Sequence, residues 1–255
     1  MRIGIIQGRL SPPTEGFQDT PKEWQKEFDL LESCGLTHIE WVITKKSFNK
    51  NPFLFNDLSA YPISSVCADN MVDGNISSRE FLQNNLAPIC EAAIRSKVGI
   101  VTIPLLEDSS LESMSRRLRF ISNMFDFHDQ FPELKFSFEV ELGANQVWDL
   151  VKVSDRFLVT YDTGNITSCK NDHREQIELL SDKINNVHLK DRTFDGNTVY
   201  PLSGNTDFKK IFNHLKNCKY DGIYTLQSAR GVTGFEENTI KTYAKIYERI
   251  YNESE

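Results

Sequence analysis

Four side chains that can bind metals or move protons stand near the ends of four successive apolar segments. They are Glu139 or Glu141 in KFSFEVEL, Asp162 in RFLVTYD, His188 in INNVHLK and Gln227 in GIYTLQ. Oxygen and nitrogen ligands of this kind suit Mn²⁺, Mg²⁺, Co²⁺ or Zn²⁺, and no soft sulfur ligand accompanies them. Each residue alone has an ordinary structural explanation, since an Asp before Thr-Gly is typical of a turn. Together they predict a polar site built from several strands.

The alternation of polar and apolar residues places these side chains on one face of each segment. Successive side chains of a strand point to opposite faces. Asn186, His188 and Lys190 therefore share one face, while the residues between them are apolar. The same parity holds in residues 135–142, 156–162 and 222–227. In each of these segments one face is apolar, and the other face carries polar side chains near its carboxyl end.

The positions of apolar runs and helical patterns predict the fold. Strands are expected at residues 2–7, 37–42, 62–68, 98–105, 135–142, 156–162, 184–190 and 222–227, and helices at residues 20–35, 78–96, 110–130, 144–153, 172–182, 206–217 and 236–251. Eight strands that alternate with helices over a chain of this length are typical of a TIM barrel. In that fold the active site lies at the carboxyl ends of the strands. We predict an α/β fold, a single (β/α)₈ TIM barrel, with residues 1–255 as one domain. A doubly wound sheet is disfavoured because no Gly-rich phosphate fingerprint follows any strand.

The clearest helical pattern is TPKEWQKEFDLLESCG, residues 20–35. Thr20 can act as the N-cap, Pro21 fits the first helical position, and Glu23 completes a capping box. An apolar stripe at helical spacing follows, and Gly35 comes after it. These features predict one continuous helix between the first two strands.

Composition and charge narrow the class of protein. The 255 residues are 39% hydrophobic and 25% charged, as in ordinary soluble globular proteins. The net charge of −7 argues against a nucleic-acid partner, because affinity for a phosphate backbone comes mainly from Lys and Arg. Five scattered cysteines without a Cys-x-x-Cys pair favour reduced thiols, and the apolar run at the N-terminus is too short for a signal peptide or membrane span. We expect a cytoplasmic protein with no nucleic-acid or membrane partner, and we leave a homo-oligomer open.

An ordered set of short motifs resembles a known family. GIIQGRLSPP, IEW, EVEL, YDTGN, VHLKDR, TVYPLSGNTDF and YDGIYTLQSAR, between Met1 and about Arg230, are similar to the xylose isomerase-like TIM barrels, a superfamily of sugar and sugar-phosphate isomerases and epimerases. The resemblance implies a divalent metal held by Glu139, Asp162 and His188, with Mn²⁺ or Mg²⁺ expected ahead of Zn²⁺ or Co²⁺. Gln227 stands where the superfamily has a fourth ligand, Glu. An uncharged amide would hold the metal more weakly or not at all, and it cannot accept a proton at neutral pH.

The chemistry implied by the resemblance is proton abstraction next to a carbonyl of a sugar or sugar phosphate, giving an enediolate. Glu139 is the expected base, and Glu141 on the same face is its substitute. Lys190 is expected to donate a proton to the enediolate oxygen or to stabilise it. With Gln227 unable to act as a second base, one-base aldose–ketose isomerisation is favoured over two-base ketose epimerisation.

Further charged residues are candidates for contacts with the substrate. Arg9, Arg192 and Arg230 could clamp a phosphate or a carboxylate, because guanidinium offers a bidentate fork to either. Glu40 stands near the end of strand two and Glu107 just beyond strand four, and either of them, or Lys190, could supply a second catalytic group.

Two other functions compete with an isomerase. A non-catalytic sugar-binding or regulatory barrel would explain Gln227 as the mark of lost chemistry. The superfamily also contains endonucleases that act at abasic DNA sites through several histidines around zinc ions. His38, His128, His173 and His214 do not stand at the required strand ends, and the chain is acidic, so that function is disfavoured.

Overall fold

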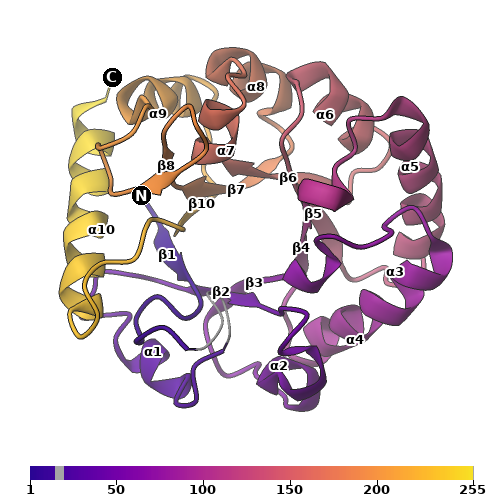
Figure 1. Cartoon of the computed structure of the whole chain (residues 1–255), viewed down its shortest axis with the longest axis horizontal. Coiled ribbons are helices and arrows are strands. Elements are labelled where there is room, and N and C mark those ends of the chain that lie inside the picture. The colour runs from indigo at the N-terminus through magenta and orange to yellow at the C-terminus, as the bar shows by residue number, and fades with distance from the viewer. Residues whose placement is uncertain (15–19, 255) are drawn as a thin grey trace.

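The computed structural model describes residues 1–14 and 20–254, which form a closed ring of eight parallel strands surrounded by helices (Figure 1). The strands are β1 (Ile3–Ile6), β2 (Ile39–Val42), β3 (Ile63–Cys67), β4 (Ile100–Leu105), β5 (Lys135–Val140), β6 (Phe157–Asp162), β7 (Ile184–Leu189) and β10 (Ile223–Leu226). β10 closes the barrel by pairing in parallel with both β1 and β7. The predicted TIM barrel is confirmed, and each predicted strand overlaps an observed one.

Most predicted helices are present, and several short elements were not predicted. The helices are α1 (Gln25–Asp29), α2 (Pro52–Phe55), α3 (Arg79–Asn85), α4 (Ala87–Arg95), α5 (Met114–His128), α6 (Ala144–Val151), α7 (Thr163–Ser168), α8 (His173–Leu180), α9 (Phe208–Asn217) and α10 (Glu236–Glu253). Single 3₁₀ turns are η1 (Phe48–Lys50), η2 (Asp69–Met71) and η3 (Glu107–Ser109), and β8 (Asp191–Arg192) pairs with β9 (Thr198–Val199) as a small antiparallel ribbon. Within the described residues, no helix has the length and apolar character needed to cross a membrane.

The predicted helix at residues 20–35 is only partly correct, because α1 covers five of those residues. Thr20 does not cap it, since the Thr20 hydroxyl accepts a hydrogen bond from Asn51 Nδ2 at 3.2 Å. The amides of Lys26 and Glu27 bond to carbonyls three residues earlier, at 3.0 and 3.1 Å. Such bonds belong to 3₁₀ turns, so the segment coils more tightly than an α-helix on either side of α1.

The predicted helix at residues 78–96 is two helices, α3 and α4, that meet at Leu86. Pro88 stands in the first turn of α4. Proline has no amide hydrogen, and its ring clashes with the carbonyl four residues earlier, so it cannot continue a helix without distortion. A new helix therefore starts just before Pro88.

The apolar core lies between the strands and the surrounding helices, and polar side chains fill part of the barrel interior. Phe138 of β5 packs edge-on against Phe120 of α5 and Phe157 of β6, with ring centroids 5.7 and 5.3 Å apart. On the opposite face of β5, Ser137 shares a 2.6 Å hydrogen bond with Thr160 of β6. Burying one large apolar side chain contributes about 1.5–3 kcal/mol. Packing on the outer face therefore fixes the strands that carry the inward polar groups.

Candidate metal and catalytic centre

Glu139, Asp162 and His188 converge in the described structure and are all buried. Each offers one ligand atom, and these atoms lie within 4.8 Å of one another. His188 Nδ1 is 3.5 Å from Glu139 Oε2 and 3.9 Å from Asp162 Oδ2. Because β5, β6 and β7 are parallel neighbours, their carboxyl ends bring the three side chains to the same end of the barrel. Three of the four residues expected as metal ligands therefore lie together.

The ring of His188 is oriented by a carboxylate from the other side of the barrel. Glu40 Oε2 lies 2.7 Å from His188 Nε2 and accepts a hydrogen bond from Asn186 Nδ2 at 3.0 Å. Thr225 Oγ1 donates to Asn186 Oδ1 at 2.9 Å, so β2, β7 and β10 are linked through one buried network. With Nε2–H donated to Glu40, Nδ1 faces the cluster. A carboxylate behind a histidine is the arrangement that fixes histidine ligands in metal sites.

The cluster and the neighbouring Glu40 contain more acidic than basic side chains. Burial opposes the charged form of His188, but Glu40, Glu139 and Asp162 together raise its pKa to about 9. Burial raises the pKa of Glu139 to about 7, with a further contribution from Asp162. A buried carboxyl with a raised pKa and an imidazole with a raised pKa both indicate a site that favours added positive charge.

Lys190 and Asn165 complete the polar surroundings of Glu139 and Asp162. The ammonium of Lys190 lies 2.7 Å from Asp162 Oδ2 and donates to Asn165 Oδ1 at 3.2 Å. Asn165 Nδ2 donates to Glu139 Oε1 at 2.9 Å. Burial raises the pKa of Asp162, but Lys190 and His188 outweigh burial and lower that pKa below its ordinary value. Lys190 thus stands beside the cluster and keeps Asp162 ionised.

The turn that supplies Asn165 explains why Asp162 is placed so firmly. Asp162 Oδ1 accepts a hydrogen bond from the backbone amide of Asn165 at 2.8 Å and caps α7. Gly164 on α7 packs so closely that an added Cβ would lie 3.0 Å from Cγ of both Lys190 and Arg192. Sequence reasoning missed Asn165, although an Asp three residues ahead of it at a strand end is an N-cap signal.

Two atoms of the cluster and one atom of Gln227 are buried polar atoms of the kind that bind a cation. His188 Nδ1 and Gln227 Oε1 are buried without a hydrogen-bond partner among the described residues, and the buried Asp162 Oδ2 is contacted by the Lys190 ammonium at 2.7 Å and faces His188 Nδ1 at 3.9 Å. A buried acceptor without a donor is costly, and carboxylate, imidazole and amide atoms are ligands for divalent ions. The residues present therefore fit a divalent metal.

Gln227 follows β10 on the same face as Thr225, whose hydroxyl contacts Asn186 inside the barrel. The register pairs Thr225 with His188, which places Gln227 one step further toward the barrel mouth. Its backbone amide donates to Leu189 at 3.2 Å, which continues the strand pairing beyond β10. Its role as a fourth ligand stays a prediction.

Glu40 and Glu107 have opposite surroundings in the structure. Glu40 is fully buried behind His188. Burial raises the pKa of Glu40, but the charge and hydrogen bond of His188 lower that pKa by more, so it lies below its ordinary value. Glu107 is exposed on η3, after β4. Glu40 is therefore better explained as the group that orients His188.

Glu141 and Arg192 form a pair beside Asn165. Arg192 Nη1 lies 3.2 Å from Glu141 Oε1 and donates to Asn165 Oδ1 at 3.0 Å and Ser168 Oγ at 3.2 Å. Glu141 is partly exposed and lies outside the three-residue cluster. Arg192 is thus connected to Glu139 through one intervening side chain, Asn165.

Arg9 and Arg230 lie together elsewhere on the same end of the barrel. Both line a small cavity of about 130 Å³ between the loops that follow β1 and β10. The three arginines proposed from the sequence therefore lie at two different places. Arg192 pairs with Glu141, whereas Arg9 and Arg230 line the same cavity.

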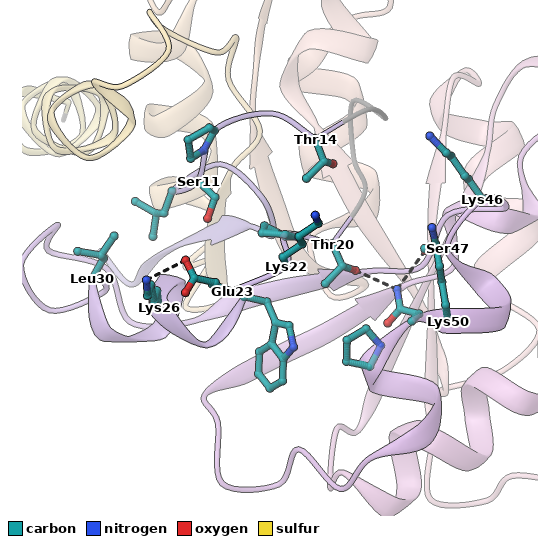
Figure 2. A pocket seen from close by; sticks show the side chains of 16 residues that line it. Ser11, Thr14, Thr20, Lys22, Glu23, Lys26, Leu30, Lys46, Ser47 and Lys50 are labelled. Atoms are coloured by element: carbon teal, nitrogen blue, oxygen red, sulfur yellow. Dashed lines mark hydrogen bonds and ion pairs between the residues drawn. The ribbon is translucent and has the colours of Figure 1, made fainter.

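A larger hollow of about 830 Å³ lies between the loop after β1, α1 and the loop after β2 (Figure 2). Figure 2 shows Lys26 paired with Glu23 at 2.8 Å, and Thr20 and Ser47 both bonded to one amide nitrogen, Asn51 Nδ2. No candidate site residue lines this hollow. We therefore assign it no part in catalysis.

The other histidines lie away from the cluster. His38 precedes β2 and packs against Gly4, while His128, His173 and His214 belong to α5, α8 and α9 outside the barrel. In residues 1–14 and 20–254, His188 is the histidine that joins the group of potential metal ligands.

Comparisons with known proteins agree with this geometry. A family model described as xylose isomerase-like TIM barrel matches residues 10–246. A Haemophilus influenzae protein named "Putative L-ribulose-5-phosphate 3-epimerase SgbU" is 30% identical over 94 residues, which is 31% of this chain and 30% of that protein. The chain thus aligns with less than a third of that curated relative.

Solved structures share the whole fold at low sequence identity. A structure of the IOLI protein with a bound zinc atom has a TM-score of 0.74 and 13% identity, covering 100% of this chain and 99% of that one. A structure of L-ribulose 3-epimerase has a TM-score of 0.74 and 15% identity, covering 99% of this chain and 95% of that one. Identities this low show a common barrel architecture.

Proposed function

Because this chain belongs to the xylose isomerase-like TIM barrel family, we propose that it is a sugar or sugar-phosphate isomerase that abstracts a proton next to a carbonyl. The observation that carries the proposal is the buried cluster of Glu139, Asp162 and His188, with Lys190 beside it. The names of the relatives, which include epimerases acting on ribulose and ribulose phosphate, support a sugar as the substrate.

The proposed metal ligands are Glu139, Asp162 and His188, with Gln227 as a fourth. A divalent cation bound there would polarise the substrate carbonyl and stabilise negative charge on its oxygen. Mn²⁺ and Mg²⁺ suit the mainly oxygen donors, and the zinc in the IOLI structure makes Zn²⁺ the first alternative to test.

The chain's own groups would move the proton. Glu139 would take it from the carbon next to the carbonyl, and its pKa near 7 in the metal-free protein suits a base at neutral pH. Asn165 holds the other face of that carboxylate through Oε1. Lys190, 2.7 Å from Asp162, would donate a proton to the substrate oxygen or stabilise its negative charge.

One-base isomerisation is favoured over two-base epimerisation. Epimerisation at one carbon needs groups on both faces of that carbon. Gln227 cannot supply a base, Glu40 is buried behind His188, and Glu107 is exposed and is not one of the three clustered residues. Lys190 is the one predicted alternative that lies beside the cluster, and it is paired with Asp162.

The proposal is tested by incubating the purified protein with Mn²⁺, Mg²⁺ or Zn²⁺ and a panel of keto and aldo pentoses and hexoses, free and phosphorylated, in deuterated water. We expect one substrate to acquire deuterium at the carbon next to its carbonyl. Turnover without deuterium would mean that the hydrogen does not exchange with solvent, and the proton-abstraction mechanism would be wrong.

A non-catalytic sugar-binding barrel is the second candidate, and Gln227 in place of a carboxylate is the observation that favours it. That function predicts sugar binding by calorimetry without deuterium exchange for any member of the panel. Exchange above a metal-free control eliminates it.

Replacing Glu40 with Gln should weaken metal binding about tenfold or more, because loss of a group behind a ligand typically costs 10–100-fold. The Gln amide would still fill the space, but it would no longer fix His188 by charge. Metal affinity is measured by titration calorimetry. Glu178→Gln is the control for the loss of one carboxylate, since Glu178 is exposed on α8 and pairs with Arg174. Equal affinities for wild type and Glu40→Gln would show that Glu40 does not position the ligand.

A further inference from the structure

Two arginines from opposite ends of the chain meet in one cavity. Arg9 follows β1 and Arg230 follows β10, and both line the cavity of about 130 Å³. β1 and β10 are paired strands, so their following loops lie side by side at the barrel mouth (Figure 1). The cavity is therefore on the same end of the barrel as Glu139, Asp162 and His188.

The loop that carries Arg9 is held in place from two sides. Arg230 Nη2 donates to the carbonyl of Gly8 at 2.6 Å, and its Nη1 donates to the carbonyl of Ser11 at 3.1 Å. From below, the buried carboxylate of Glu27 accepts the backbone amides of Gly8 and Leu10 at 2.8 and 3.0 Å. Both arginines are thus positioned before any ligand arrives.

The electrostatics of this cavity favour a negative ligand. Arg9 is only 5% exposed, and burial together with the nearby charge of Arg230 lowers its pKa to about 9. Burial also lowers the pKa of Arg230, although the charges of Glu27 and Glu236 oppose this shift, and Glu27 opposes the shift of Arg9 as well. Glu236 is the acidic residue of the lining, and it already accepts the amide of Gly234 at 3.0 Å. The cavity also adjoins the first turns of the 18-residue helix α10, whose amino end carries partial positive charge.

The size and place of the cavity fit one end of a sugar rather than a whole sugar. Its 130 Å³ corresponds to about four water molecules at roughly 30 Å³ each. Arg230 is three residues beyond Gln227, and three residues span at most about 11 Å. That upper bound is comparable to the length of a pentose or hexose chain, and the cavity lies at the end of the barrel that carries the cluster, so its place suits one end of such a chain.

We propose that the cavity between Arg9 and Arg230 binds the anionic terminus of the substrate, a phosphate or a carboxylate. Identifying that terminus as part of a sugar rests on the proposed function. Two guanidinium groups match a dianion better than a monoanion, so phosphate is the expected group. Because Nη1 and Nη2 of Arg230 already donate to backbone carbonyls, Arg230 would contact the ligand through its other N–H bonds. Arg192, held by Glu141 and Asn165, is not part of this subsite.

Direct binding tests the subsite without any need for turnover. Inorganic phosphate is titrated into wild type, Arg9→Lys, Arg230→Lys and Arg174→Lys by calorimetry, with acetate as the carboxylate probe and ionic strength held constant. Lysine keeps the charge but loses the planar fork, so phosphate affinity should fall about tenfold or more in the first two variants. Arg174 is an exposed residue of α8 paired with Glu178, and its variant should bind like wild type.

Unfolding temperatures of the same samples separate a ligand contact from a structural role. A purely structural pair would lower the unfolding temperature of Arg9→Lys and Arg230→Lys while phosphate affinity of the folded protein stayed unchanged. That result, or wild type that binds neither phosphate nor acetate at millimolar concentration, overturns the proposal. Tighter acetate than phosphate binding assigns a carboxylate to the terminus.

Deuterium exchange connects the subsite to the reaction. For a phosphorylated sugar and its free counterpart, the ratio of the two kcat/KM values should fall at least about tenfold in Arg9→Lys. In wild type, inorganic phosphate should compete with the phosphorylated sugar, and this measurement stands even if the variants fold poorly. Phosphate binding lost in Arg9→Lys without any exchange in wild type would refute the proposed function and retain the subsite. Exchange with an unchanged ratio and no phosphate competition would refute the subsite alone.

Discussion

Replacing Glu139 with Gln should lower the rate of deuterium exchange into the substrate by at least about 10²-fold, the lower end of what a positioned general base contributes. The substitution removes the only carboxylate of the cluster that is not paired with Lys190 or bonded to His188 Nε2. Gln has the same size, and its carbonyl can still accept the hydrogen bond from Asn165. The loss should therefore come from chemistry and metal binding, with the fold intact.

Glu141→Gln is the matched control, because it makes the same change two residues further along the chain. The Glu141 carboxylate is partly exposed and paired with Arg192, so its variant should lose much less activity. Both variants are assayed at saturating metal, and the metal affinity of each is measured by calorimetry. If Glu139→Gln exchanges as fast as wild type, Glu139 is not the base, and Glu141 or Lys190 takes its place.

The fold could be predicted because its main signals are local. Alternation along β5, β6 and β7 separates an apolar face from a polar one, and each of these strands overlaps its predicted range. The same alternation brings Glu139, Asp162 and His188 into one barrel once the strands are parallel. Strand parity and strand direction predict that polar side chains meet at these strand ends, and the resemblance to the xylose isomerase-like barrels selects these three among them as metal ligands.

The contacts around the cluster could not be predicted in the same way. Glu40 and His188 are 148 residues apart in sequence, and they meet only because the closed barrel sets β2 across from β7. Strand parity shows that Glu40 points inward, but it does not show which side chain it faces. From the sequence, Glu40 is therefore expected to contact the substrate or to supply a second catalytic group, whereas in the structure it lies behind His188.

Short elements such as α7 could not be predicted from the sequence for a different reason. α7 is TGNITS, a run of residues with low helix propensity, and it forms because Asp162 caps it and tertiary contacts hold it. Thr163 shows this directly, since its hydroxyl donates to the carbonyls of His188 and Lys190 at 3.0 and 2.8 Å. Helix propensity alone gives no signal for such an element, and Asn165 was missed with it.

The variant Gln227→Glu should tighten binding of a divalent ion by about tenfold or more, roughly 1.4 kcal/mol, because affinity for hard cations rises with ligand charge. Gln227 Oε1 is buried without a hydrogen-bond donor among the described residues, so a carboxylate there would gain a cation partner. Without metal, the added charge near Glu139 and Asp162 should lower the unfolding temperature. The rise in unfolding temperature on adding metal should therefore be larger than in wild type.

The activity of Gln227→Glu distinguishes a site that works with one base from a site that has lost a second base. If one base is sufficient, exchange should stay similar or fall while the metal is held more tightly. If the site has lost a second base, the variant should gain exchange on the opposite face of the substrate carbon and form the epimer. Gln130→Glu adds the same charge at an exposed position beyond α5, at the other end of the barrel, and should change neither property. Metal affinity that is equal in wild type and Gln227→Glu would show that residue 227 does not face the metal, and the centre would then rest on Glu139, Asp162 and His188 alone.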